Sequence, residues 1–234
     1  MLQSIKNHID NDLYRLHRQV ETVAKEISKS VLKRLPSYLA YLKTLSDSQS
    51  PYISATTLAN ALGMGEVQVR KDLAAVSNGG RPKIGYLRES LIDDIQQFLG
   101  YDNTTDAVLI GAGKLGQALL GYSGFDAYGL NILAAFDVAP TADTTDEGKP
   151  IYSLDKLESF CKANMVLMGI ITVPARDAQA VCDQLIRCGI KAIWNFAPAH
   201  LEVPSNILVQ NENMATSLAV LSMHLQAQMK EKNI

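Results

Sequence analysis

A glycine-rich turn is the part of this 234-residue chain best suited to hold a ligand. It lies in VLIGAGKLGQALL, where Gly111, Gly113 and Gly116 have the spacing G-x-G-x-x-G. Between a strand and a helix, the first glycine permits a tight turn and the second lets a pyrophosphate approach the backbone. The third lets the helix and the strand pack closely. Free N–H groups at the start of the helix favour phosphate, so the turn predicts dinucleotide binding.

The second predicted strand ends in AAFDV, in which Asp137 lies 21 residues after Gly116. A carboxylate at this point of the second strand accepts a hydrogen bond from the adenine ribose 2′-hydroxyl and repels a 2′-phosphate. We therefore expect NAD(H) rather than NADP(H). The alternative is a degenerate Rossmann-like domain that binds no nucleotide.

Two further turns follow predicted strands, ITVPA at 171–175 and NFAP at 195–198. Because open α/β sheets bind ligands at the carboxyl ends of their strands, these turns are expected to flank the nicotinamide. The alternative is that they are tight strand exits without a ligand. An enzyme needs an acid or base beside the hydride. The turns offer Thr172 and Asn195, with His200 beyond them, which favours a cofactor that is held rather than used.

The elements that position these residues alternate between apolar runs and helical patterns over residues 101–234. This alternation predicts an α/β fold with a parallel sheet and crossover helices. Helices are expected at Leu115–Leu120 and at Ala175–Cys188, which stops at Gly189, and the apolar C-terminus predicts a last helix. The expected strands are Ala107–Ile110, Ile132–Phe136, Met165–Ile170, Ala192–Asn195 and Ile207–Val209.

Residues 27–100 read as short helices separated by turns. In the first helix, marked by leucines at 35, 39, 42 and 45, Pro36 is tolerated only near the start. Ser54 is expected to cap a helix that stops at Gly63, and Ser90 to cap one that stops at Gly100. A short helix, a tight turn and a second helix describe a helix-turn-helix.

The second of these helices, EVQVRKDLAAV, carries Gln68, Arg70 and Lys71. These residue types reach base edges and phosphates in a major groove. The next segment, SNGGRPKIGYLR, adds Arg81 and Lys83 on a glycine-rich ribbon, as expected of a wing that grips DNA. The alternative is a solvated charged helix on a small docking domain.

Charge and composition narrow the classes of protein further. Residues 1–100 hold 13 Lys and Arg against 10 Asp and Glu, and the remainder holds 9 against 14, which favours an anionic partner at the front. No apolar run reaches the roughly 18–20 residues of a membrane span, and the N-terminus is charged, so a cytoplasmic protein is expected. Three cysteines without C-x-x-C spacing and four scattered histidines predict no metal site.

An apolar stripe over residues 1–26 predicts a helical arm, packed on its own domain or paired with a second chain.

Together these motifs resemble the Rex family of redox-sensing transcriptional repressors. The resemblance covers residues 28–228 and rests on LKRLPSYLAYL, VQVRKDL, the GY after the wing, GAGKLGQALL, AAFDV, TVPA, GIKAIWNFAP and LEVP. It implies a homodimer that binds a palindromic operator, exchanges its last helix between subunits, and is released by NADH, whereas NAD⁺ permits binding. The expected parts are an N-terminal arm (1–26), a winged helix-turn-helix domain (27–100), a Rossmann domain (101–212) and a dimerisation helix (213–234).

Matched motif by motif, the resemblance also implies site residues. Those expected around NAD(H) are Gly111, Ala112, Gly113, Lys114, Leu115, Gly116, Asp137, Val138, Thr172, Val173, Pro174, Asn195, Phe196 and Met214. Those expected to face DNA are Arg34, Gln68, Arg70, Lys71, Arg81 and Lys83. Tyr86 and Asn213 are expected to couple the two domains.

The coupling residues depart from the family pattern. Well-studied members join the wing tyrosine to an arginine of the first helix and an aspartate before the last helix, where this chain has Ala40 and Asn213. Met214 replaces the aromatic residue that approaches the nicotinamide. Because each missing charge-assisted contact is worth about 1.5–3 kcal/mol, we expect Tyr86 to make neutral hydrogen bonds and the Rossmann domains to repack as rigid bodies. If the alignment shifts by one residue, Glu212 supplies the carboxylate.

Two other functions are also compatible with these sequence motifs. An NAD-dependent oxidoreductase with an accessory helical domain would turn over NADH with a small carbonyl compound. A nucleotide-binding scaffold with a protein-docking front domain would show no salt-dependent DNA binding.

Overall fold

The computed structural model describes residues 29–46 and 50–231. The chain divides into two compact units, Met1–Asp102 and Asn103–Ile234. The predicted arm at 1–26 lies outside the described residues. Among the described helices, none combines the length and the apolar composition that crossing a bilayer requires.

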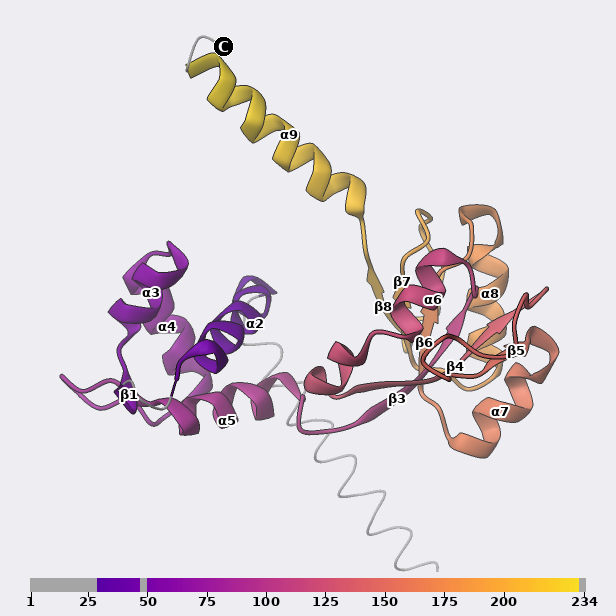
Figure 1. Ribbon diagram of the computed structural model, residues 1–234, viewed down its shortest axis with the longest axis horizontal. Helices are drawn as coiled ribbons and strands as arrows, with labels where there is room; N and C mark the ends of the chain where they lie inside the picture. Colours follow the sequence, from indigo (N-terminus) through magenta and orange to yellow (C-terminus); the bar gives the residue numbers. More distant parts are fainter. Residues whose placement is uncertain (1–28, 47–49, 232–234) are drawn as a thin grey trace, which may run out of the picture. The chain divides into compact units, whose positions relative to one another are not determined.

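The first unit is a helix-turn-helix with a two-stranded antiparallel sheet. Among the described residues of this unit the helices are α2 (Lys29–Thr44), α3 (Ala55–Leu62), α4 (Glu66–Val76) and α5 (Arg88–Leu99) (Figure 1). Strand β1 (Tyr52–Ile53) pairs antiparallel with β2 (Tyr86–Leu87). Side chains from all four helices and both strands share one buried core, which fixes α4 relative to its neighbours.

The predicted ends of α3 are confirmed. Ser54 Oγ accepts a hydrogen bond from the Thr57 N–H at 3.0 Å, and Gly63 follows the helix in the left-handed region at φ 63°. Gly100 ends α5 in the same way, at φ 71°.

Ser90 does not cap α5, so that prediction was wrong. The helix begins two residues earlier, at Arg88, after Leu87 in extended conformation. Arg88 is buried, and its guanidinium donates to the carbonyl oxygens of Leu45 and Ser46 at 3.1 and 2.8 Å. These contacts hold the first turn of α5 against the segment that follows α2.

The prediction for Pro36 was also wrong, because this residue lies in the interior of α2. An interior proline costs a helix about 3 kcal/mol. The helix buries Leu35, Tyr38, Leu39 and Leu42 almost completely, and each large apolar side chain contributes about 1.5–3 kcal/mol on burial. Burial therefore outweighs the proline.

The second unit is built on a six-stranded, all-parallel sheet in the order β5-β4-β3-β6-β7-β8. The chain moves outward from β3 to β4 and β5, then returns to the other side of β3 with β6. This switch point lies between β3 and β6, where such sheets bind ligands. The strands are β3 (Thr105–Ile110), β4 (Leu130–Asp137), β5 (Ile151–Ser153), β6 (Met168–Ile171), β7 (Ala192–Asn195) and β8 (Leu208–Asn211).

Helices cover both faces of the sheet (Figure 1). α7 (Leu157–Asn164) and α8 (Ala175–Arg187) share one buried cluster with the sheet, and α6 (Lys114–Leu120) and the 3-10 helix η1 (Ser123–Tyr128) share another. A 3-10 turn, η2 (Leu154–Lys156), precedes α7, and α9 (Met214–Glu231) follows β8. The predicted α/β fold with a parallel sheet is confirmed.

Several predicted boundaries were displaced. The strand expected at Met165–Ile170 begins only at Met168, because Met165 ends α7 in the left-handed region at φ 50°. The strand expected at Ile207–Val209 runs from Leu208 to Asn211.

Candidate functional site

The turn after β3 needs glycine at the first and last glycine positions of the G-x-G-x-x-G motif. Gly111 has φ +103°, and a Cβ there would lie 2.9 Å from Val173 Cγ1 and 3.0 Å from the carbonyl carbon of Thr172. A Cβ on Gly116 would lie 1.9 Å from the carbonyl oxygen of Gly111. The two glycines therefore allow α6 to start directly against the end of β3.

The middle glycine faces open space. No heavy atom outside its neighbours lies within 4 Å of a Cβ built on Gly113. Gly113, Lys114 and Leu115 are exposed. The backbone is thus accessible at the point where the dinucleotide pattern places the pyrophosphate.

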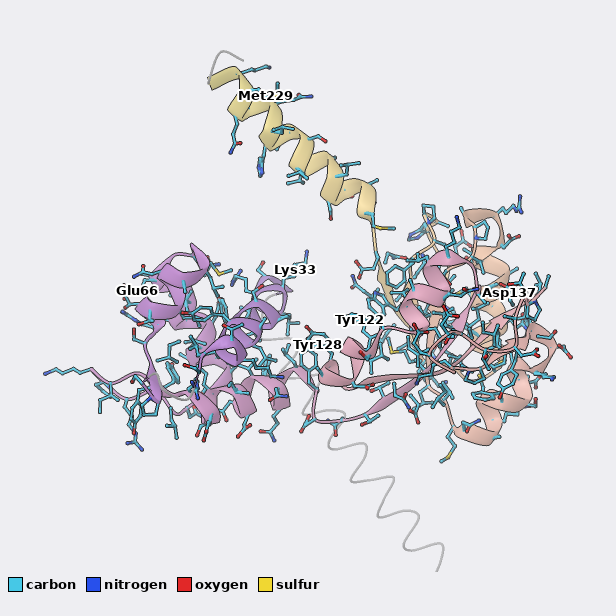
Figure 2. The ribbon with its side chains drawn as sticks, in the orientation of Figure 1. Lys33, Glu66, Tyr122, Tyr128, Asp137 and Met229 are labelled. Atoms are coloured by element: carbon cyan, nitrogen blue, oxygen red, sulfur yellow. The ribbon has the colours of Figure 1, made fainter. Side chains whose placement is uncertain are left out.

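Asp137 lies at the end of β4, beside the glycine turn (Figure 2). Its Oδ2 accepts from the Ala112 N–H at 2.7 Å, and its Oδ1 accepts from the Ala139 N–H at 3.0 Å. Each carboxylate oxygen keeps acceptor capacity beyond these bonds. The carboxylate is therefore tied to the turn and still able to accept from a ribose hydroxyl. Val138, next in the chain, is exposed.

The TVPA turn after β6 packs onto the glycine turn from the neighbouring strand. Thr172 Oγ1 lies 3.0 Å from the carbonyl oxygen of Ile110 and 2.7 Å from that of Gly111, and its single O–H is shared between these two acceptors. Val173 packs on Gly111, and Pro174 caps α8 and is exposed. The hydroxyl of Thr172 thus fixes the shape of the glycine turn.

Asn195, in the NFAP turn after β7, is fully buried. Its Oδ1 accepts from the Ala197 N–H, and its Nδ2 donates to the carbonyl oxygens of Ala197 and Ala199 and to Asn211 Oδ1. The amide is therefore occupied by its own turn. The Phe196 N–H donates to the Ile171 carbonyl at 2.9 Å, which places NFAP beside TVPA.

The end of β8 is fastened to β7 through Glu212. Its N–H donates to the Asn195 carbonyl at 2.8 Å, and its Oε1 accepts from Trp194 Nε1 at 2.9 Å. Asn213 then caps α9, since its Oδ1 accepts from the Thr216 N–H at 3.1 Å. We define this set of bonds, together with the Asn195–Asn211 contact, as the β7–β8 latch. Met214 begins α9 and is 67% exposed.

Helix α9 carries large apolar side chains that the single chain leaves in solvent. Each is between 44% and 67% exposed, up to Met229 near the end of the helix (Figure 2). They are Met214, Leu218, Val220, Leu221, Met223, Leu225 and Met229.

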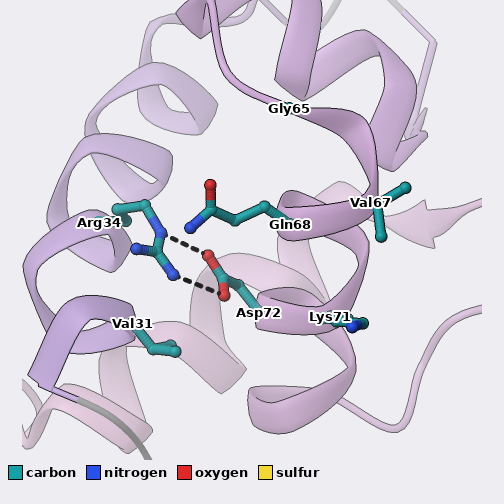
Figure 3. Close-up of a pocket in the computed structure, with 7 residues that line it drawn as sticks. All are labelled: Val31, Arg34, Gly65, Val67, Gln68, Lys71 and Asp72. Carbon is teal, nitrogen blue, oxygen red and sulfur yellow. Dashed lines mark hydrogen bonds and ion pairs between the residues drawn. The ribbon is translucent and has the colours of Figure 1, made fainter.

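In the first unit, Arg34 of α2 forms a two-bond ion pair with Asp72 of α4 (Figure 3). Nε donates to Oδ2 at 2.7 Å and Nη2 to Oδ1 at 2.9 Å, while the Tyr38 hydroxyl donates to Oδ2 at 2.7 Å. The hydrogen bond to Asp72 raises the pKa of Arg34 still further, and burial raises the pKa of Tyr38 to about 12. The structure therefore places Arg34 between two helices, with its charge paired.

The other residues expected to face DNA lie on the surface. Gln68 and Lys71 are exposed on α4 and line an open depression of about 590 Å³ together with Val67. Arg70 forms an ion pair with Glu66, one turn earlier. Arg81 and Lys83 are exposed on the hairpin between α4 and β2.

This wing depends on two close approaches. The Arg81 N–H donates to the Gly85 carbonyl and the Gly85 N–H to the Arg81 carbonyl, both at 2.9 Å. Gly85 has φ +94°, and a Cβ there would lie 2.3 Å from the Ile53 carbonyl oxygen. A Cβ on Gly80 would lie 2.8 Å from Cζ of Tyr86, whose ring is buried in the first unit. Tyr86 thus supports the base of the wing.

Three residues that hold these sites together were not predicted from the sequence: Tyr38, Asp72 and Trp194. Glu212 was predicted only as a substitute for the coupling carboxylate, whereas in the structure it accepts from Trp194. For Asp72 a signal existed, because its carboxylate lies between the apolar Val69 and Leu73, which the structure buries, and a buried carboxylate requires a partner. The contact between Trp194 and Glu212 joins β7 to the residue after β8, 18 positions further along the chain, and left no local pattern in the sequence.

Nothing in the described part of the chain gathers three or more metal-ligating side chains. Cys161, Cys182 and Cys188 are buried and unpaired by disulfides. Burial raises the pKa of Cys161 to about 11, so its thiol is protonated and unreactive near neutral pH.

Two family matches follow the two units. Residues 26–74 match the family described as putative DNA-binding protein N-terminus, and residues 102–199 match the CoA binding domain family.

Whole-chain relatives share one description, redox-sensing transcriptional repressor Rex. The relative from Porphyromonas gingivalis is 40% identical over 86% of this chain and 96% of its own length. That from Clostridium botulinum is 40% identical over 87% and 98%. The crystal structure of RSP with β-NAD⁺ and operator DNA is 34% identical, with a TM-score of 0.79 over 88% of this chain and 96% of that one. The RSP structure with β-NADH is 33% identical, with a TM-score of 0.77 over 89% and 98%.

Proposed function

This chain belongs to the Rex family of redox-sensing transcriptional repressors, and from that premise we propose that it represses transcription by binding operator DNA according to the NADH/NAD⁺ ratio. The observation that carries the proposal is the union, in one chain, of a helix-turn-helix with an exposed polar α4 and a dinucleotide turn at the switch point of a parallel sheet. Each domain match alone would fit many proteins.

The residues around the turn fit NAD(H). The exposed backbone at Gly113 receives the pyrophosphate, and Asp137 accepts from the adenine ribose. Val138, the first turn of α6 and the TVPA turn line the rest of the site, with Phe196 and Met214 toward the nicotinamide. Thr172 and Asn195 shape the turns, because their polar groups are already bonded to the protein.

On the DNA side, we assign direct contacts to Gln68, Lys71, Arg81 and Lys83, with Arg70 exchanging Glu66 for a phosphate. The N-terminal residues of a recognition helix contact base edges, whereas wing cations hold phosphate. Arg34 is assigned a positioning role, because its guanidinium is paired with Asp72.

A second copy of this chain completes the protein. The apolar side chains of α9 are too exposed for a helix that works alone, and a palindromic operator requires a two-fold symmetric reader. We therefore propose a homodimer in which α9 packs on the partner. The proposed boundaries stay at 27–100, 101–212 and 213–234, and the proposed location is the cytoplasm, where bacterial DNA lies.

NADH can shift DNA affinity only if it binds one dimer conformation more tightly than the other. We propose that the two Rossmann domains repack as rigid bodies, and that Tyr86 and Asn213 lie where this movement meets the DNA-binding domain. Ala40 is exposed on α2 and offers no charge to this contact.

We further propose that the chain is not an enzyme. Proton transfer at the nicotinamide needs a free acid or base within hydrogen-bond reach. At the ends of β6 and β7, the strands expected to flank the nicotinamide, the polar side chains are Thr172 and Asn195, and both are engaged with the backbone. An oxidoreductase would turn over NADH with small carbonyl compounds, and we expect none.

The deciding experiment is a gel shift on the promoter of the protein's own operon, titrated with NADH against NAD⁺. We expect NADH to release the DNA and NAD⁺ to leave it bound, with affinity falling steeply as salt rises. If the fraction of bound DNA changes with neither NADH nor NAD⁺, the proposed sensing function is refuted. If no protein–DNA complex forms at any salt concentration, the proposed DNA-binding function is refuted.

A further inference from the structure

The carboxylate of Asp72 organises the contact between α2 and the recognition helix α4. It is 3% exposed and accepts three hydrogen bonds, two from Arg34 and one from Tyr38. Two-bond arginine–carboxylate pairs fix the plane of the guanidinium as well as its position. The guanidinium of Arg34 is therefore held in one orientation by Asp72 of α4.

Two of the three remaining N–H groups of Arg34 point at Gln68. Figure 3 draws the Gln68 amide nitrogen toward Arg34, which would set donors against donors. Turned by half a rotation, Gln68 Oε1 accepts from Arg34 Nη1 at 3.0 Å and from Nη2 at 3.1 Å. Arg34 has no acceptor, so this is the orientation that satisfies both side chains.

The amide of Gln68 is then divided between protein and solvent. Both lone pairs of its oxygen are used by Arg34, and its two N–H donors face away from Arg34. Gln68 is exposed in the first turn of α4 and lines the open depression with Val67 and Lys71. The first turn of such a helix is the part that meets base edges.

We propose that Gln68 reads a hydrogen-bond acceptor in the major groove, because Arg34 leaves its amide with donors alone. The inference rests on the proposed DNA-binding function and names the chemistry that one residue selects. Guanine, adenine and thymine each present an acceptor there, whereas cytosine presents the N4 donor. The two-bond pairing of glutamine with adenine needs the amide oxygen, which Arg34 occupies. Each half-site thus contains one position at which cytosine is rejected.

The test is selection of duplexes from a random DNA pool by the full chain with NAD⁺, followed by anisotropy titration of the enriched duplexes. We expect one position per half-site to disfavour cytosine by about 10–100-fold. Gln68→Ala should abolish the base preference at that position and leave the preferences at the other positions unchanged. Gln68→Glu keeps a partner for Arg34 but presents an acceptor oxygen to the groove. The base preference at the same position should therefore change to cytosine or adenine, which present amino donors there.

Two further variants separate positioning from contact. Arg34→Lys removes the fork that holds the amide, so Gln68 should regain the two-bond pairing and the position should narrow to adenine. Lys71→Ala, on the same side of α4, is the matched control. It should weaken binding to all duplexes and lower the salt slope by about 1, with base preferences intact. If Arg34→Lys loses its thermal transition, Gln68→Glu decides alone.

Equal base preferences in Gln68→Ala and the parent chain would overturn the inference, because Gln68 would then contact phosphate or nothing. So would an adenine-only preference in the parent chain. If the parent chain enriches no duplex, the proposed function fails. If the parent chain enriches duplexes and the Gln68 variants show the same base preferences, only the inference about Gln68 fails and the proposed DNA-binding function stands.

Discussion

The dinucleotide turn offers a comparison between two glycines that differ in one respect. A methyl on Gly116 would lie 1.9 Å from the Gly111 carbonyl oxygen, whereas a methyl on Gly113 would meet nothing within 4 Å. To restore an ordinary contact of 3.4 Å, α6 must move about 1.5 Å from β3. Such overpacking costs up to about 3 kcal/mol, and the better helix propensity of alanine returns about 1 kcal/mol. Gly116→Ala should therefore lose about 2 kcal/mol of stability, a fall in Tm of roughly 8 °C for a domain of this size.

Gly113→Ala should behave in the opposite way. Its backbone, at φ −71° and ψ −173°, is one that alanine adopts freely, so Tm should stay within about 2 °C of the parent. The added methyl occupies the space where the pyrophosphate approaches, so NADH affinity should fall at least about 10-fold, or 1.4 kcal/mol. The assays are differential scanning fluorimetry without nucleotide and titration of NADH fluorescence. Unchanged NADH binding in Gly113→Ala would refute the assignment of the turn, and an unchanged Tm in Gly116→Ala would refute the packing argument.

Four more outcomes follow from contacts described above. Asp72→Asn removes one partner of a buried pair, so urea denaturation should show a loss of about 3–5 kcal/mol in the first unit; a loss below 1 kcal/mol would contradict the burial of this contact. Because the pKa of Tyr38 is raised from 10.0 to about 12, the neutral hydroxyl stabilises the fold below pH 10, and this contribution is lost as pH rises toward 12. Tyr38→Phe should flatten the fall in stability over that range, and an unchanged slope would contradict the assignment. Asp137→Asn should lower the preference for NADH over NADPH by about 10-fold in competition titrations, since it removes the charge that repels a 2′-phosphate; an unchanged ratio would place the ribose elsewhere. Gly85→Ala, at a positive φ and against the Ile53 carbonyl, should weaken DNA binding while NADH titration stays normal, and equal losses in both assays would point to general unfolding.

Local patterns in the sequence were sufficient for the parts of the fold that repeat or cap. The glycine turn and the caps at Ser54 and Gly63 follow from neighbours a few residues apart. Asp137 follows from its distance along the chain to the glycine turn, and the parallel sheet from the alternation of apolar runs with helical patterns. Pro36 and Ser90 were misjudged because burial across the first unit outweighed local preference. β5, with three residues, is too short to show a period.

The candidate site shows the same division. Residue type and spacing indicated which side chains gather at the strand-end turns and on the surface of α4, but the partner of each polar group depends on the tertiary fold. Arg34 reads as a cation for DNA until Asp72 is seen opposite it. Asn195 reads as a ligand contact until its amide is found filled by Ala197, Ala199 and Asn211.

The β7–β8 latch gives α9 the mechanics of a lever. The helix has 18 residues, so at 1.5 Å per residue its arm is about 27 Å long. Its root is clamped to the strand that ends in the NFAP turn, through Trp194, Asn195 and Glu212. A rotation of about 10° at that root, with displacements near it below 1 Å, would carry the far tip about 5 Å along its arc. A change too small to disturb the sheet is thus magnified, by length alone, to the scale of a whole side chain.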